Sequence, residues 1–130
     1  MKAQEESGNA AEFKVRGTFR FERKEHLKGR ADIQAVFKRG KRLGCQGAKL
    51  FVLKNSLAYS RICFTLSRGF GNAVKRNRAR RLGREAYRLL RPRLHGGYDL
   101  ILLVFPEMRA SLSTRIRQLE FLCSKADLLK

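Results

Sequence analysis

Acidic side chains are scarce in this chain, and so are the residue types from which enzymes usually build metal and nucleophile sites. Only 11 Asp and Glu stand against 30 Lys and Arg, and there are two histidines and three cysteines. His26 and His95 fall in predicted loops, and the sequence contains no carboxylate pair, histidine cluster or nucleophile motif. We therefore predict no catalytic residue, no metal ligand and no cofactor bound by the protein alone.

The cysteines are odd in number and widely spaced, at Cys45, Cys63 and Cys123. Their spacing matches neither a zinc site nor a disulfide framework, which indicates small apolar residues in a reducing compartment. Long apolar runs are missing too, because the longest, residues 100–105, is far shorter than the ~18 residues that span a membrane. The N-terminus lacks the apolar run of a secretory signal. We expect a cytoplasmic protein with no membrane partner.

What the chain has in excess is positive charge, with a formal net charge of +19 over 130 residues. Hydrophobic residues still make up 43% of it, enough for one modest core, so the charge does not imply disorder throughout. Residues 1–18 show no periodicity and are expected to form a disordered tail, and residues 19–130 a single domain. So large a charge imbalance predicts a polyanionic partner.

The basic side chains concentrate in residues 72–90, where they keep a helical order. At about 100° per residue, one stripe and its border hold Arg76, Asn77, Arg80, Arg81, Arg84 and Arg88. The opposite side, expected to face the core, holds Ala79, Leu82, Ala86, Leu89 and Leu90. Like charges four residues apart cost about 0.2–0.5 kcal/mol per pair, so the stripe does not serve the isolated fold. Arginine forms fork-like hydrogen bonds with phosphate, and the pattern therefore predicts a nucleic-acid backbone as the partner.

Apolar periodicity and turn signals predict the remaining elements, in the order α-β-β-β-α-β-α. Helices are expected over residues 30–39, 72–90 and about 112–126, and strands near 41–45 and over 50–53, 61–66 and 98–105. Gly40 is the expected C-cap of the first helix, Ser111 or Ser113 the N-cap of the last, and Pro92 the stop of the basic helix. The fold class predicted is α/β (α+β), with a mixed sheet of about four strands.

The run Gly69-Phe70-Gly71 lies between a predicted strand and the basic helix, as the glycines of dinucleotide-binding loops do. The third glycine of that fingerprint would fall at Val74, and no acid stands at the end of the next predicted strand. A tight strand-to-helix turn is the simpler interpretation, although a helix N-terminus can still attract phosphate.

Phe37 and Phe51 leave two interpretations open. Both rings can belong to the core. Alternatively, the first helix and the sheet can form an open face, where aromatic rings stack on single-stranded bases at about 1–3 kcal/mol per base.

The longest specific pattern in the chain surrounds the basic helix. It reads Ser67-Arg68-x-x-Gly71-Asn72-Ala73-Val74-x-Arg76-Asn77-Arg78-x-Arg80-Arg81-Leu82-x-Arg84-Glu85-Ala86. This pattern resembles the signature of the protein component of bacterial ribonuclease P. The resemblance covers most of residues 27–129, including Asp32-Ile33-x-x-Val36-Phe37-x-x-Gly40, Arg61-Ile62-x-Phe64-Thr65-Leu66-Ser67 and Tyr98-Asp99-Leu100-Ile101-Leu102. Residues 1–18 lie outside it.

The resemblance implies a small two-layer α/β sandwich, in which the basic helix packs on a four-stranded sheet through a left-handed βαβ crossover. It implies a single RNA-binding domain and a part in tRNA maturation, the hydrolytic removal of the 5′ leader from precursor tRNA. In this family a large RNA carries the chemistry with magnesium ions, while the protein binds that RNA and the leader. The implied partners are the catalytic ribonuclease P RNA and precursor tRNA, with no DNA partner and a monomeric protein outside the complex.

The resemblance also implies roles for particular residues. Those expected to meet the catalytic RNA are Arg76, Asn77, Arg78, Arg80, Arg81, Arg84 and Arg88. Those expected to position phosphates or metal-bound water are Ser67, Arg68 and Asn72. Those expected to line a cleft for the single-stranded leader are Ile33, Phe37 and Phe51.

Four positions depart from the family's pattern. Gly69 stands where Lys is usual, Ile33 where many members carry Phe, and Phe105 where a basic residue is common before Pro106. Gly83 stands in mid-helix in place of a large apolar residue. We expect Gly83 to cost about 1 kcal/mol of helix propensity and some packing.

Two other classes share some of these features. A ribosomal or other structural RNA-binding protein would share the basic helix but would show no preference for a leader. A DNA-binding helix-turn-helix module needs a helix before the basic helix, where the sequence predicts a strand instead. In every case binding should weaken steeply with salt.

Overall fold

The computed structural model describes residues 22–107 and 110–130, so the predicted tail and the predicted domain start at residue 19 lie outside the described residues. The elements are η3 (Arg23–Glu25), α1 (Arg30–Arg39), β1 (Lys41–Cys45), β2 (Ala48–Lys54), β3 (Arg61–Leu66), α2 (Ala73–Leu90), η4 (Arg91–Arg93), β4 (Tyr98–Val104) and α3 (Leu112–Lys125). Within this part of the chain, three α-helices and four strands occur in the predicted order, which confirms the α+β class.

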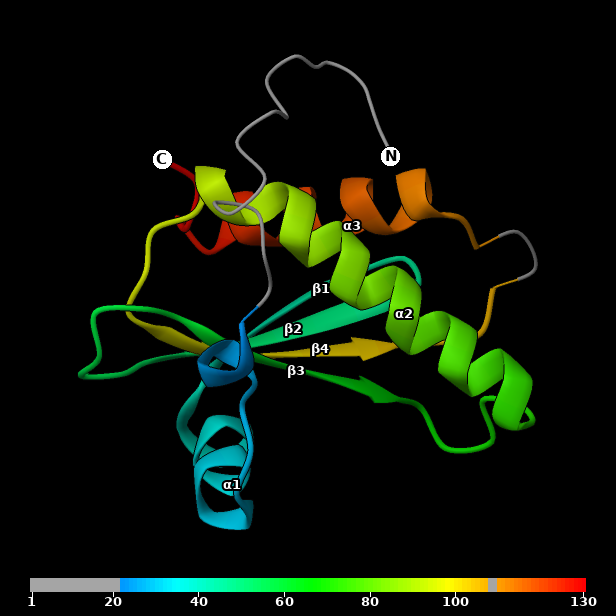
Figure 1. Ribbon diagram of the computed structural model, residues 1–130, viewed down its shortest axis with the longest axis horizontal. Helices are drawn as coiled ribbons and strands as arrows, with labels where there is room; N and C mark the ends of the chain where they lie inside the picture. Colours follow the sequence, from blue (N-terminus) through cyan, green and yellow to red (C-terminus); the bar gives the residue numbers. More distant parts are fainter. Residues whose placement is uncertain (1–21, 108–109) are drawn as a thin grey trace.

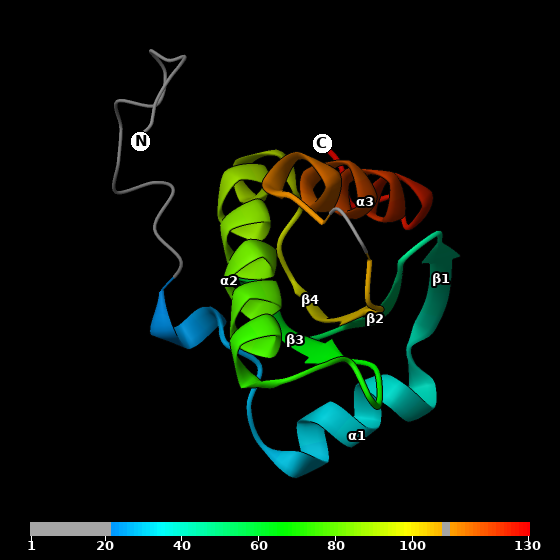
Figure 2. The ribbon, with the colours of Figure 1, turned by 90° about the vertical axis from the view of Figure 1, so that its right-hand side faces the viewer.

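The four strands form one mixed sheet in the order β1-β2-β4-β3. The pairs β1–β2 and β2–β4 are antiparallel, and β3 pairs with β4 in parallel. Helices α2 and α3 cover one face of the sheet, and α1 packs against the other (Figures 1 and 2). The sheet therefore has a fully covered face and a face that only one short helix protects.

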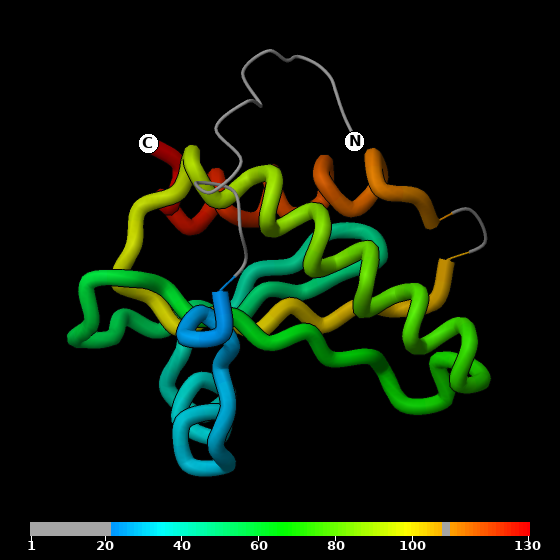
Figure 3. Tube along the Cα trace, in the orientation of Figure 1, coloured from blue at the N-terminus to red at the C-terminus, as the bar shows by residue number. Residues whose placement is uncertain are grey.

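The connection from β3 through α2 to β4 is a left-handed crossover, as the family resemblance implies. Figure 3 follows the chain along β3, back over the sheet as α2, and out again along β4. In Figure 2, α2 stands on the left beside β3, on the same side of the sheet as α3, and β4, β2 and β1 continue the sheet to the right of β3. Parallel crossovers are right-handed in about 98% of cases, so this connection is an exception to the general rule.

The main core lies between the sheet and the layer formed by α2 and α3. Successive strand residues point to opposite faces, and the sheet side of this core holds Leu50, Val52, Ile62, Leu66, Leu100, Leu102 and Val104. The helices contribute Ala79, Ala86, Tyr87, Leu90, Leu119, Leu122 and Cys123. Cys123 is buried as predicted, whereas Cys45 and Cys63 are only half-buried.

The predicted helix ends are confirmed, with one choice resolved. The Ser111 hydroxyl accepts a hydrogen bond from the Thr114 N–H at 3.2 Å, so Ser111 rather than Ser113 is the N-cap of α3. The N–H of Gly40 donates to the carbonyl of Val36 at the end of α1. After Leu90 the chain does not leave the helix directly but continues into η4, a short helix that accepts proline in its first turn.

The buried face of α2 differs from the predicted one by a rotation of the helix. Ala79, Ala86 and Leu90 are buried as predicted, but Leu82 and Leu89 are only half-buried. Tyr87, 1% exposed, takes part in the core instead. Because the helix turns its Tyr87 side inward, Arg76 and Arg80 lie on a half-buried flank of α2, outside the core.

Gly83 lets α2 lie close to the sheet. It is buried, and a Cβ placed on it would lie 2.8 Å from Cδ1 of Phe64 on β3. The Phe64 ring occupies the space that a larger residue at position 83 would take. The expectation that Gly83 loses packing is therefore wrong, although its cost in helix propensity of about 1 kcal/mol remains.

We predict that Gly83→Ala destabilises the protein, although alanine is the better helix former. Overpacking a core costs about 1–3 kcal/mol, which exceeds the gain in propensity of about 1 kcal/mol. Urea denaturation followed by circular dichroism measures the free energy of unfolding. In a Phe64→Leu background the same substitution should cost clearly less, and stabilisation by Gly83→Ala alone would contradict the packing described here.

Candidate nucleic-acid interface

Most acidic side chains of the described part of the chain are already paired. Within residues 22–107 and 110–130, six of the eight Asp and Glu form ion pairs. The pairs are Arg61–Asp32, Arg61–Asp99, Arg88–Glu85, Arg91–Glu25, Arg93–Glu120 and Arg115–Glu107. None of these pairs involves the arginines between positions 76 and 84 of α2, so no acid in these pairs neutralises their charge.

Two of the ion pairs hold the fold together at the end of the sheet. Asp99, 5% exposed, accepts hydrogen bonds from Nε and Nη2 of Arg61 at 2.9 and 2.6 Å. Glu25, also 5% exposed, pairs with Arg91 at 2.5 Å and fixes η3 beside the end of α2. Buried carboxylates need such partners, so these acids serve structure and do not neutralise the basic helix.

The residues of α2 predicted to bind RNA differ in their exposure. Asn77, Arg78, Arg81 and Arg84 are exposed, whereas Arg76, Arg80 and Arg88 are half-buried. Arg78 also donates to the carbonyl of Ala110 at 3.3 Å, across to the segment before α3. The array is therefore broad, covering the outer side of the helix and the flank above β3.

Arg88 is the member of the array that is least available to a partner. Its Nε and Nη2 donate to the two carboxylate oxygens of Glu85 at 3.2 and 2.5 Å. This hydrogen bonding raises the pKa of Arg88, and the carboxylate offsets its charge. We expect Arg88 to contribute less to polyanion binding than Arg81 or Arg84.

The turn into α2 holds the three residues predicted to position phosphates. The Ser67 N–H donates to Val104 at 3.0 Å and keeps the turn joined to β4, while Arg68 is exposed. The Asn72 side chain accepts from the Lys75 N–H at 3.0 Å and caps α2. Gly69, with φ of 72°, supplies the left-handed conformation that this turn requires. The capped helix N-terminus carries partial positive charge, which adds to that of Arg68.

On the other side of the sheet, Phe37 and Phe51 form one aromatic pair with unequal exposure. Their ring centroids lie 4.9 Å apart, edge to face. Phe37 is 38% exposed, whereas Phe51 is 7% exposed and belongs to a small core with Leu27 and Val36. Of the two predicted rings, only Phe37 faces solvent, and Phe51 supports it from beneath. Ile33 is half-buried against the same small core.

The sheet continues beyond this aromatic pair as an open face, which we define by Lys49, Thr65, Leu103 and Phe105. These side chains are exposed or half-buried, whereas their neighbours on the helical side of β2 and β4 are buried. The ammonium of Lys49 lies 5.8 Å from the ring centroid of Phe105. Strand alternation in β2 and β4 could have indicated these positions, but the sequence does not show how far α1 extends over the sheet.

The basic flank of α2 and the open face adjoin across the edge strand β3. Arg80 on α2 is close enough to Cys63 of β3 to oppose the rise that burial causes in the pKa of its thiol. Burial lowers the pKa of His26, and the positive charges of Lys28 and Arg84 lower it further. These couplings show that the charge of α2 reaches the border between the two regions.

The described residues show no group of three or more His, Cys, Asp or Glu side chains that could hold a metal ion. No helix in the same part of the chain is long and apolar enough to span a membrane. What the described surface does present is a wide cationic array beside a partly apolar sheet face with a solvent-facing aromatic ring.

Comparison with known proteins points to one family. A family model described as Ribonuclease P matches residues 21–127. The chain is 46% identical over 77 residues to the ribonuclease P protein component of Natranaerobius thermophilus, covering 59% of this chain and 67% of that protein. It is also 46% identical over 81 residues to the protein of the same name from Borreliella burgdorferi, covering 60% of this chain and 68% of that one.

Solved structures agree with the sequence comparison. The RNase P protein from Thermotoga maritima superposes with a TM-score of 0.69 at 29% identity, over 78% of this chain and 96% of that one. An RNase P protein from Staphylococcus aureus superposes with a TM-score of 0.70 at 21% identity, over 82% and 98% of the two chains, and shows the same fold.

We predict that Arg84→Gln raises the pKa of His26. The guanidinium of Arg84 is one of the positive charges that lower this pKa, so its removal favours the imidazolium form. An NMR pH titration of the His26 ring resonances measures the shift. Arg81→Gln removes the same charge from another exposed position of α2 that is not among the charges acting on His26, and it should leave this pKa nearly unchanged. Equal shifts in both variants would contradict a local effect.

Proposed function

This chain belongs to the ribonuclease P protein family, and we propose that it is the RNA-binding subunit of the ribonucleoprotein that removes the 5′ leader from precursor tRNA. The observation that carries the proposal is the cationic array of α2, in which only Arg88 has an acidic partner among the described residues, beside an open sheet face with a solvent-facing aromatic ring. The array suits the backbone of a folded RNA, and the open face suits an extended single strand.

In this proposal α2 binds the catalytic RNA. Arginine side chains that no acid of the described residues neutralises can form bidentate hydrogen bonds with phosphate oxygens. Arg81 and Arg84 are the principal contacts because both are exposed. Ser67, Arg68 and Asn72 border the positive N-terminus of α2, where a phosphate of the same RNA is favoured.

The open face binds the leader. Phe37 offers its ring to a base, Phe51 supports that ring from behind, and Ile33 packs against the small core to which Phe51 belongs. From Ile101, the buried partner of Phe51, to Phe105, which follows the end of β4, the chain advances four residues, roughly 13 Å at about 3.3 Å per residue. Lys49 lies along this stretch and supplies positive charge for the strand's phosphates.

The protein's share of the reaction is binding and orientation. Within residues 22–107 and 110–130, six of the acids are held in ion pairs, and no three of the acids, histidines and cysteines lie together as a metal-binding group. We assign the magnesium of the holoenzyme to RNA phosphates, where a divalent ion supplies charge stabilisation and an activated water. Phosphodiester hydrolysis then belongs to the RNA, and the chain holds catalyst and leader together.

The direct test reconstitutes the full chain with a bacterial ribonuclease P RNA and precursor tRNA at physiological magnesium. We expect the chain to stimulate leader removal, measured as the rate of precursor cleavage under single-turnover conditions. Stimulation should require the unpaired arginines, so a double variant Arg81→Ala/Arg84→Ala should lose most of it. Arg117→Ala, an exposed charge on α3, is the control and should behave like the original chain.

A folded chain that gives no stimulation would contradict the proposal. Equal affinity of the RNA–protein complex for precursor and mature tRNA would instead favour a structural RNA-binding protein, which has no reason to prefer a leader.

We further predict that Phe37→Ala weakens the binding of precursor tRNA to the holoenzyme. Loss of one stacked base costs about 1–3 kcal/mol, or roughly 5- to 150-fold in affinity. The measured quantity is the ratio of affinities for precursor and mature tRNA, which cancels any general loss of fold. Phe121→Ala is the matched control because this ring is 50% exposed on α3, on the opposite side of the sheet. An unchanged ratio in Phe37→Ala would contradict stacking at this position.

A further inference from the structure

Gly44, in the edge strand β1, is a glycine that its surroundings do not require. It is exposed, and its φ lies outside the left-handed region that favours glycine. Among the described residues, a Cβ placed on it would meet only Cγ of Lys49, at 3.9 Å, which is an ordinary contact. Glycine weakens a strand, since it has no side chain to pack and loses more backbone entropy on folding than other residues do. Position 44 therefore carries a cost that its neighbours do not explain.

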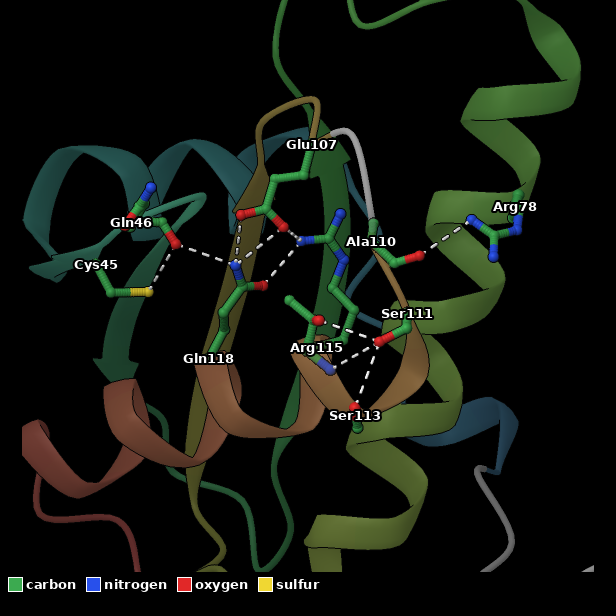
Figure 4. A network of polar contacts seen from close by, with 10 residues as sticks. Cys45, Gln46, Arg78, Glu107, Ala110, Ser111, Ser113, Arg115 and Gln118 are labelled. Atoms are coloured by element: carbon green, nitrogen blue, oxygen red, sulfur yellow. Dashed lines mark hydrogen bonds and ion pairs between the residues drawn. The ribbon is translucent and has the colours of Figure 1, made fainter.

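The adjoining turn does not explain this glycine either. The turn between β1 and β2 takes its left-handed residue from Gly47, with φ of 90°. On the helical side of the sheet, the carbonyl of Gln46 accepts a hydrogen bond from Nε2 of Gln118 at 3.0 Å, which ties the turn to α3 (Figure 4). The turn is thus formed and anchored without Gly44. A glycine in a strand can also mark a place where a ligand approaches the backbone closely.

Gly44 is the last member of a row of residues that crosses the whole open face. Its register partner on β2 is Lys49, which pairs with Leu103 of β4, and Leu103 pairs with Thr65 of β3. The residues on either side of Gly44 pack against the main core, so the row belongs to the other face of the sheet. Three strand spacings of about 4.8 Å make the row roughly 14 Å long. At its β1 end the row has no side chain.

Two cations flank the gap that Gly44 leaves. Lys49 lies opposite it, and Arg42 lies two residues earlier on the same strand and the same face. Both side chains are exposed, and neither forms an ion pair with an acid of the described residues. The gap lies at the edge of the sheet opposite β3 and α2 (Figure 2). A place without a side chain between two such cations suits a phosphate of an RNA backbone.

We propose that the leader crosses the sheet along this row and leaves it over Gly44, with one of its phosphates between Arg42 and Lys49. This inference rests on the proposed function, to which it adds the direction of the strand and a second point of attachment. In this arrangement the cleavage site lies on the α2 side, where the catalytic RNA binds, and the 5′ part of the leader reaches β1. A single nucleotide cannot span the row, so affinity for the precursor increases with leader length until the leader reaches Gly44.

The experiment measures the affinity of the reconstituted holoenzyme for precursor tRNAs with a mononucleotide or a decanucleotide leader. Gly44→Val places a branched side chain in the gap. It should weaken binding of the long-leader precursor by about tenfold, the factor that one charge-assisted hydrogen bond supplies, and leave the short-leader precursor within about twofold. The melting temperature should stay unchanged or rise, because valine is a better strand former than glycine. A lower melting temperature with equal losses for both leaders would show a structural role and would overturn the proposal.

Two neighbouring cations of β1 provide a matched pair of variants. Arg42 and Lys41 are both exposed but lie on opposite faces of the strand. Arg42 pairs with Phe51 of the small core, whereas Lys41 pairs with Val52 of the main core. Arg42→Gln should weaken binding of the long-leader precursor by about tenfold, and Lys41→Gln should stay within about twofold of the original chain. Equal losses in the two variants would show general attraction by net charge and would overturn the proposal.

Failure of this inference is distinguishable from failure of the proposed function. If the original chain gives equal affinity for mature tRNA and for both precursors, the proposed function is wrong, and the crossing at Gly44 is wrong with it. If the original chain prefers the long leader, and Gly44→Val and Arg42→Gln keep that preference, only the crossing at Gly44 is wrong.

Discussion

Helix α2 sits on the sheet through its smallest residues, and most features of the molecule follow from that close contact. Ala79, Gly83 and Ala86 are buried on α2 together with Tyr87 and Leu90, and the Phe64 ring fills the space at Gly83. A helix this close to β3 places its half-buried flank above the edge of the sheet. The charge of Arg80 and Arg84 therefore reaches Cys63 and His26, and the basic array adjoins the open face.

The distribution of acids explains why so much positive charge stays available. Asp99 and Glu25 are buried in pairs that fix β3 and η3, and Glu85 offsets Arg88. Since the acids are committed to structure, the exposed arginines of α2 repel one another until a polyanion arrives. The charges that stabilise the fold are thus different from those that remain available to a partner. Arg115 is an exception, because it is buried and only its Nη1 forms hydrogen bonds, while Nε and Nη2 have no partner.

The two faces of the sheet differ in how much of them is exposed, because different helices cover them. α2 and α3 together close one face, while α1 is too short to close the other. Phe51, on β2, lies under α1 and is buried, whereas Phe37, on α1 itself, is exposed to solvent. The pair looked equivalent in the sequence, and only the packing of α1 on the sheet separated a supporting ring from a solvent-facing one.

The sequence by itself determined the element order, the bounds of α1 and β3, the C-cap at Gly40, and the family, because these depend on neighbouring residues and on a long specific pattern. It did not determine the side of α2 that Tyr87 turns inward, the fit of Gly83 against Phe64, or the half-satisfied burial of Arg115. Each of these depends on contact between segments far apart in the chain, so helical periodicity alone does not contain it. Tertiary structure decided which of the many arginines are available to a partner, because it decided which of them form ion pairs with the few acids.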